Sequence, residues 1–297
     1  MLFTLSSAKS LVLAFAIVLG CAASGDAQPR LRVHTATEAE PLSLMALRDT
    51  PRGAEVAMQV TGSTRVITSN GMPSHEVGAF PNRGNPHRVS AQSYRFEMPL
   101  EPQVGQAKPL PRFASFGVAV NGVPFDPNAA EFWQGDPQSG WTYNALGGAV
   151  ALGLDANYAH VQPSGAYHYH GLPVGLMQQL GWSASAPSPL IGFAADGFPI
   201  YALTASVDGQ IVRMTSSYQL KSGQRPGGSA PGGVYDGAFT QDYAYVAGSG
   251  TLDECNGAQV TTAEFPKGTY AYFLTDVYPT VPRCLKGEMG SGLTKRR

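Results

Sequence analysis

Residues 190–203 read LIGFAADGFPIYAL, and this stretch decides the fold. Two short apolar segments, 190–194 and 198–203, lie on either side of Asp196-Gly197. An Asp-Gly pair tolerates the positive φ angles of a tight turn, so the stretch predicts two antiparallel strands joined as a hairpin. The same kind of pair occurs at Asn70-Gly71, Asn121-Gly122, Asp208-Gly209, Asp236-Gly237 and Asn256-Gly257.

Glycine and proline divide the rest of the chain into short segments. The 297 residues include 35 glycines and 23 prolines, which favours short strands over long helices. Residues 64–69, 116–120 and 269–275 are further strand-like segments, and residues 173–180 form the best helical segment because proline fits the start of a helix. Residues 221–233 are predicted to form a flexible glycine-rich loop. We expect a mainly β fold, with a single sandwich or barrel-like domain, long loops and one or two short helices.

The N-terminus has the pattern of an export signal. Lys9 precedes an apolar run, 11–19, that has the length of a signal peptide and is too short to span a membrane. Small residues before Gln28 suit a signal peptidase, which predicts a signal peptide over residues 1–27. Alternatively, Cys21 ends a lipobox-like segment and would carry a lipid anchor. The protein is therefore expected to be periplasmic or secreted, or else an outer-surface lipoprotein.

Composition limits the partners of the remaining chain. Charged residues make up 14% and the formal net charge is −1, so no basic face for nucleic acid is expected. No second apolar run is long enough for a transmembrane span. We expect a leader or linker over residues 28–55, one folded domain over 56–290 and a basic disordered tail over 291–297.

Cys255 and Cys284 are the only cysteines outside the signal region. In an oxidising compartment such a pair favours a disulfide. Closing a loop of about 30 residues would stabilise the fold by roughly 3–4 kcal/mol in the chain-entropy model. The alternative is a pair of thiolate metal ligands, which the absence of a Cys-x-x-Cys spacing disfavours.

Tyr167-His168-Tyr169-His170 is the segment with the clearest chemistry. Side chains alternate between the faces of a strand, so His168 and His170 would share one face, about 6–7 Å apart, with the two tyrosines on the other. His160 lies eight residues earlier, before a turn at Pro163. Two strand histidines and a third from a neighbouring segment could bind zinc or copper.

Acidic and tyrosine side chains are expected around this site. Asp155 precedes His160, and Asp196 lies in the hairpin turn, so either carboxylate could orient an imidazole. Tyr167 and Tyr169 would be neighbours of the ligands without being ligands. The sequence contains no Gly-x-Ser-x-Gly nucleophile motif, no His-Glu-x-x-His motif and no phosphate-binding glycine loop.

The sequence resembles the YHYH-domain family, which takes its name from the run at 167–170. The resemblance covers most of the chain from about residue 60 to residue 290, in the segments 69–75, 80–81, 84–86, 120–126, 159–163, 165–173, 191–201, 252–257 and 268–284. It implies an exported protein, without implying a particular reaction. Because His75 falls in the first matching segment, the resemblance also implies His75 as a fourth ligand or a neighbour of the ligands.

Three functional classes remain open at this point. The first is an exported protein that binds zinc or copper through His160, His168 and His170, with or without hydrolytic activity. The second is a metal-free recognition module for a glycan or peptide, with Tyr167, Tyr169 and tryptophans as stacking surfaces. The third is a buried hydrogen-bond network with a purely structural role.

Overall fold

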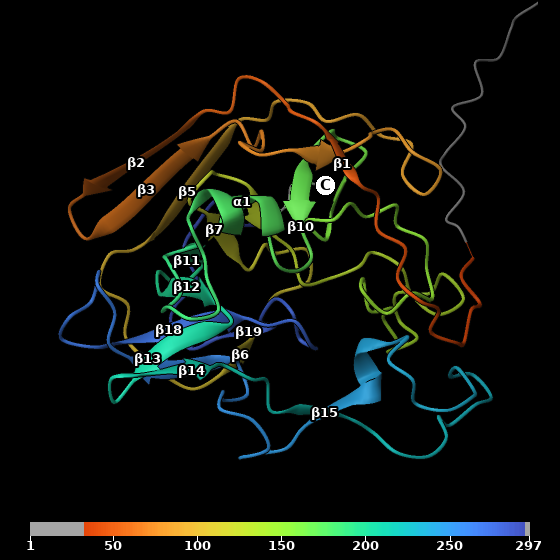
Figure 1. Cartoon of the computed structure of the whole chain (residues 1–297). Coiled ribbons are helices and arrows are strands. Elements are labelled where there is room, and N and C mark those ends of the chain that lie inside the picture. Colours follow the sequence, from red (N-terminus) through yellow and green to blue (C-terminus); the bar gives the residue numbers. More distant parts are fainter. Residues whose placement is uncertain (1–32, 295–297) are drawn as a thin grey trace, which may run out of the picture. The chain divides into compact units, whose positions relative to one another are not determined.

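The hairpin at residues 190–203 lies in the middle of an eight-stranded sheet (Figure 1). The computed structural model describes residues 33–294. Strands account for 31% and helices for 3%, which confirms the mainly β class. The strands of the described residues do not close into a barrel.

The eight-stranded sheet has the order β17-β18-β12-β11-β7-β8-β10-β9. Pairing is parallel for β12 with β18 and for β8 with β10, and antiparallel elsewhere. The strands are β7 (Gly117–Ala119), β8 (Pro124–Phe125), β9 (Ala159–Val161), β10 (Tyr167–Tyr169), β11 (Gly192–Ala194), β12 (Pro199–Ala202), β17 (Gly257–Val260) and β18 (Thr269–Leu274).

The predicted turn pairs connect several of these strands. Gly197 has a φ of 92° between β11 and β12, and Gly122 has a φ of 83° between β7 and β8. Asp208 and Gly209 both have positive φ in the turn between β13 (Thr204–Val207) and β14 (Gln210–Arg213), as a type I′ turn requires. The sequence therefore identified these hairpins correctly.

A three-stranded sheet packs against the eight-stranded sheet. It consists of β2 (Val56–Thr61), β3 (Thr64–Ser69) and β5 (Tyr94–Pro99) in the order β2-β3-β5. Ile67, Phe96 and Met98 are each about 1% exposed and belong to the same apolar core as the central strands. The guanidinium of Arg65 lies 3.7 Å from the centre of the Phe193 ring, which joins the two sheets by a cation–π contact.

The remaining elements are short. Residues 173–180 were predicted to be helical, and α1 (Val174–Gln179) confirms this; residues 146–154 form no helix. One 3-10 turn, η1 (Thr240–Asp242), precedes β16. The small two-stranded sheets pair β1 (Leu47–Asp49) with β4 (Val77–Gly78), β13 with β14, β15 (Tyr218–Leu220) with β16 (Tyr243–Tyr245), and β6 (Lys108–Pro109) with β19 (Cys284–Leu285).

Cys255 and Cys284 form the predicted disulfide, with 5.1 Å between their Cα atoms. It joins the segment before β17 to β19, 29 residues later in the chain. The pairing removes both thiolates from the set of metal ligands. The alternative assignment of these cysteines as a metal site is therefore wrong.

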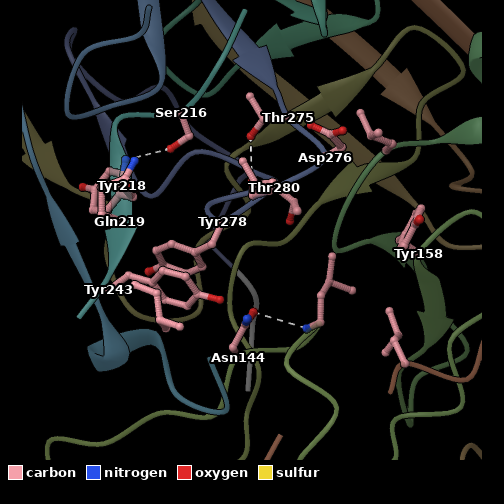
Figure 2. Close-up of a pocket in the computed structure, with 15 residues that line it drawn as sticks. Asn144, Tyr158, Ser216, Tyr218, Gln219, Tyr243, Thr275, Asp276, Tyr278 and Thr280 are labelled. Atoms are coloured by element: carbon pink, nitrogen blue, oxygen red, sulfur yellow. Dashed lines mark hydrogen bonds between the residues drawn. The ribbon is translucent and has the colours of Figure 1, made fainter. Parts of the chain in front are cut away.

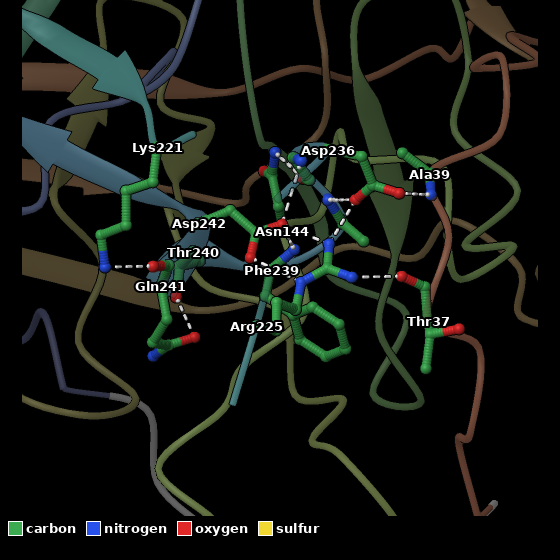
Figure 3. A network of polar contacts seen from close by, with 12 residues as sticks. Thr37, Ala39, Asn144, Lys221, Arg225, Asp236, Phe239, Thr240, Gln241 and Asp242 are labelled. Atoms are coloured by element: carbon green, nitrogen blue, oxygen red, sulfur yellow. Dashed lines mark hydrogen bonds and ion pairs between the residues drawn. The ribbon is translucent and has the colours of Figure 1, made fainter. Parts of the chain in front are cut away.

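The glycine-rich loop at 221–233 is held by a buried arginine, contrary to the expectation of a flexible loop (Figure 3). Arg225 donates from Nε and Nη2 to the two carboxylate oxygens of Asp242, at 2.8 and 2.6 Å. It also forms an ion pair with Asp236 and donates to the carbonyl of Thr37. The loop is rich in glycine and polar residues, so its composition does not predict that the side chain of Arg225 is buried.

The structure also bears on the ends of the chain. Within the predicted leader, His34 and Met45 form bridges with Trp133 and Asp155, so this segment is attached to the domain. Ser291 and Thr294 pair with Glu97 and Ala114, where the composition predicted a disordered tail. The predicted signal peptide, Cys21 and residues 295–297 lie outside the described residues. Of the described helices, none has the length and apolar composition needed to cross a membrane.

Candidate metal centre

His160 and His168 lie opposite each other on two paired strands. In the antiparallel register of β9 and β10, His160 is the partner of His168. The turn between the strands closes with hydrogen bonds from Gly165 to Gln162 and from Gln162 to Ala166. Gly165 has a φ of 85°, and a Cβ there would lie 1.9 Å from Oγ of Ser90, so both the conformation and the space require glycine.

His170 completes a cluster of three imidazoles. It follows β10 two residues after His168, and its ring lies on the same side. The ring centres lie 4.7 Å apart for His160 with His168, 4.9 Å for His160 with His170, and 4.7 Å for His168 with His170. One ring nitrogen from each residue lies within 4.8 Å of the other two, so the three form a group that could hold a metal ion.

Backbone carbonyls fix which nitrogen two of these rings present to the cluster. Nδ1 of His160 lies 2.9 Å from the carbonyl oxygen of Leu152, and Nδ1 of His168 lies 3.2 Å from that of Ala166. A carbonyl only accepts, so each Nδ1 donates a proton and each Nε2 of the neutral ring carries the lone pair. Metal-binding histidines in proteins are commonly oriented in this way.

The distance between His160 and His170 suits a shared ion. Their Nε2 atoms lie 3.1 Å apart. In a tetrahedral zinc site with Zn–N bonds of about 2.0–2.1 Å, neighbouring ligand nitrogens are about 3.3 Å apart. Since Nε2 of His160 carries a lone pair directed at Nε2 of His170, either a proton or a metal ion has to lie between them.

The loop that supplies the carbonyl of Leu152 is itself held in place. The side-chain amide of Asn85 donates to the carbonyl oxygens of Leu152, at 3.5 Å, and of Val161, at 2.8 Å. It thereby connects this loop to the strand that carries His160. His168 and His170 are each 3% exposed, and His160 is half-buried, so solvent reaches the cluster mainly beside His160.

The opposite face of β10 carries a separate buried network. The hydroxyl of Tyr169 donates to Nε2 of His75 at 2.5 Å and accepts from Asn121. The hydroxyl of Tyr167 donates to the carboxylate of Asp155 at 2.7 Å and accepts from Asn157. All these residues are less than 7% exposed.

A model of one protein family matches residues 95–287, about two thirds of the chain, and its description is YHYH protein. The chain belongs to the YHYH protein family. No curated protein and no solved structure gives a significant match to it. The family match includes all three histidines of the cluster, whereas His75 lies before its first residue.

The structure brings together only part of the site expected for this YHYH protein. His160, His168 and His170 form the cluster, and His75 does not join it, because both of its ring nitrogens bond elsewhere, to Tyr169 and to the carbonyl of Glu76. Asp155 lies with Tyr167 on the other face of the strand. The structure therefore does not support the expectation of a fourth ligand at His75 or that of an orienting carboxylate at Asp155.

Asp196 forms hydrogen bonds within the hairpin turn and to a neighbouring loop of the YHYH protein. Its carboxylate accepts from the hydroxyl of Tyr272 at 2.6 Å and from the backbone of Gly287 at 2.9 Å. Burial raises its pKa, and these hydrogen bonds partly offset that effect. Asp196 does not orient an imidazole of the cluster, since the carbonyls of Leu152 and Ala166 do so. Every residue has a backbone carbonyl, so residue type cannot predict these contacts.

The tyrosines of the YHYH run are not stacking surfaces. Tyr167 and Tyr169 are 1% and 0% exposed, and they pack against Phe80, Phe125 and His75. A ring with no exposed face does not stack on a glycan or a peptide. The recognition hypothesis that depends on these two residues is therefore wrong.

The network around His75 predicts a pH dependence of stability. Burial lowers the pKa of His75, although the Glu76 carbonyl and Asp155 act in the opposite direction. The unfolded chain then binds a proton near pH 6.5, which the folded protein binds only at lower pH, so stability falls as the pH falls below about 6.5. Between pH 7.5 and pH 5.5, we expect the free energy of unfolding to fall by about 1 kcal/mol less in His75→Gln than in the wild-type protein.

Denaturant unfolding at the two pH values, with a chelator present, measures this difference. The chelator removes metal ions, so metal binding at the three-histidine cluster does not affect the free energy of unfolding of any variant. His87→Gln is the matched control, because no side-chain bond of His87 belongs to the network. Equal pH dependence in wild type and His75→Gln would contradict the assignment.

Proposed function

We propose that this YHYH protein binds a transition-metal ion, zinc or copper, through Nε2 of His160 and His168 and a ring nitrogen of His170. The observation that carries the proposal is the convergence of three ring nitrogens within 4.8 Å, with backbone carbonyls holding Nδ1 of two of the rings. Three imidazoles on one β hairpin supply three ligands and leave a fourth tetrahedral position for water or another ligand.

The chemistry of the ligands favours zinc or copper over harder ions. Imidazole nitrogen binds these borderline metals well, whereas calcium and magnesium prefer oxygen. The nearby carboxylate of Asp155 faces away from the cluster, and the cysteines are paired with each other. The group therefore consists of nitrogen donors alone.

We also propose that the protein functions outside the cytoplasm, in the periplasm or after secretion. The N-terminal pattern of a charged residue followed by a short apolar run supports export. The disulfide between Cys255 and Cys284 supports an oxidising compartment independently.

Elemental analysis of protein purified without a histidine tag tests the metal proposal. After loading with zinc or copper and gel filtration, we expect about one ion per chain. His168→Ala combined with His170→Ala should reduce the content to near zero, since a single imidazole seldom retains an ion through gel filtration.

His87→Ala is the matched control and should retain the full metal content. Circular dichroism of each variant shows whether the fold is kept. Wild-type protein that takes up neither metal, or a double variant that still takes up one ion per chain, would refute the proposal.

A further inference from the structure

A pocket separate from the histidine cluster lies beside the paired strands β15 and β16 (Figure 2). Its volume is about 620 Å³, within the range of about 300–1,000 Å³ for pockets that bind small molecules. The walls come from the loop at 144–146, the turn before β9, the strands β15 and β16, and the segment 275–280 that follows β18.

Tyrosine side chains form two walls of this pocket. Tyr243 and Tyr278 stack with ring centres 4.0 Å apart and an angle of 10°, and Tyr218 meets Tyr278 edge-on at 5.7 Å. Figure 2 shows Tyr158 across the cavity from this stack. All four rings are half-buried, so part of each lies open to the cavity.

The position of Tyr158 depends on its backbone and on a neighbouring glycine. Tyr158 has a φ of 52°, which is uncommon for an aromatic residue and is often found at functional sites. A Cβ at Gly171 would lie 3.0 Å from Cβ of Tyr158 and 3.1 Å from the side chain of Leu146. Glycine there allows both wall residues to pack closely against the chain that leaves β10.

The polar groups of the pocket are almost all neutral. Asn144, Gln219 and several hydroxyl-bearing residues line it, among them Ser216 and Thr275. Asp276 is its only charged lining residue, and it forms an ion pair with Arg213. Burial raises the pKa of Tyr243 to about 12, so its hydroxyl remains a hydrogen-bond donor at neutral pH.

We propose that this pocket binds a neutral saccharide. A sugar ring has a C–H face that packs against tyrosine rings and a rim of hydroxyls that bond with amides and hydroxyls. The absence of lysine, arginine and histidine from the lining disfavours phosphorylated, sulfated or acidic ligands, which need a cation. The volume accommodates about one or two sugar rings.

The pocket adjoins the strand segment that carries a proposed metal ligand. The hydroxyl of Thr280 donates to the carbonyl of His170 at 2.8 Å, and the backbone N–H of His170 donates to the carbonyl of Tyr158 at 2.7 Å. The imidazoles do not line the pocket. Saccharide binding thus requires no metal, and the two proposals can fail independently.

A glycan microarray probed with the labelled, disulfide-bonded protein in the presence of a chelator tests the proposal. The array carries neutral mono- to tetrasaccharides of glucose, galactose, mannose and N-acetylglucosamine, with sialylated and sulfated glycans beside them. We expect binding to a subset of the neutral glycans. Calorimetry with the strongest binder should then show about tenfold weaker affinity for Tyr243→Ala, because the stacked ring is removed.

Three further variants make the outcome specific. Gln219→Ala changes an exposed lining residue without disturbing the core, and we expect several-fold weaker binding. Tyr243→Phe retains the ring and should bind more tightly than Tyr243→Ala. If the alanine variant does not fold, Gln219→Ala provides the test of weakened binding. Tyr235→Ala changes a tyrosine outside the pocket and should bind like wild type.

The proposal would be overturned by any of three results. The first is no binding to any neutral glycan on the array. The second is binding restricted to the sialylated or sulfated glycans. The third is an affinity that neither Gln219→Ala nor the Tyr243 variants change.

Discussion

Arg225→Ala is expected to lower the free energy of unfolding by about 3–5 kcal/mol, the range typical of a broken buried ion pair. The side chains of Arg225 and Asp242 are both fully buried, and that of Asp236 is 21% exposed. Removing the guanidinium leaves two carboxylates close together without a counter-charge. It also removes the hydrogen bond that ties the 221–233 loop to the carbonyl of Thr37, and a second one, within the loop, to the carbonyl of Gly232.

Denaturant unfolding of the disulfide-bonded protein measures this loss. Arg95→Ala is the matched control, because the ion pair of Arg95 with Glu97 is exposed and should contribute less than about 1 kcal/mol. If Arg225→Ala were as stable as Arg95→Ala, the buried ion pairs would not hold the loop.

Zinc is expected to stabilise the wild-type protein strongly. A ligand that binds only the folded state at about 1,000 times its Kd adds about 4 kcal/mol to the free energy of unfolding. If the loss of one imidazole in His168→Ala raises the Kd about 1,000-fold, the same zinc concentration adds only about 0.4 kcal/mol. Thermal or denaturant unfolding with and without zinc measures both values.

Two controls separate binding at the cluster from general effects of the ion. His87→Ala should be stabilised by zinc as much as wild type, and magnesium should have little effect on either protein because it prefers oxygen ligands. Equal stabilisation of wild type and His168→Ala by zinc would show that the ion binds elsewhere.

Local patterns in the sequence were sufficient to predict much of the fold. The Asp196-Gly197 and Asn121-Gly122 turns lie between paired strands, and the glycine of each turn has the positive φ angle that glycine tolerates. The alternation within 167–170 also correctly separated two histidines from two tyrosines. Such predictions succeed because the relevant geometry spans only a few residues.

The rest of the site depends on contacts between distant segments. His75 comes near the run in space, yet it meets the tyrosine face, and only the pairing of strands from different parts of the chain determines this. The hydrogen bonds that orient His160 and His168 come from the backbone, where residue type gives no information. The tyrosine pocket combines side chains from seven separate segments, so no local motif reveals it.

X-ray absorption spectroscopy of the stoichiometric zinc complex tests the central claim most directly. The cluster predicts a first shell with three imidazole nitrogens at about 2.0–2.1 Å from zinc and one further light ligand. His168→Ala should lower the imidazole contribution by one or abolish binding. A shell composed of sulfur or of oxygen alone, or an imidazole contribution that His168→Ala leaves unchanged, would contradict the assignment of the metal to these three histidines.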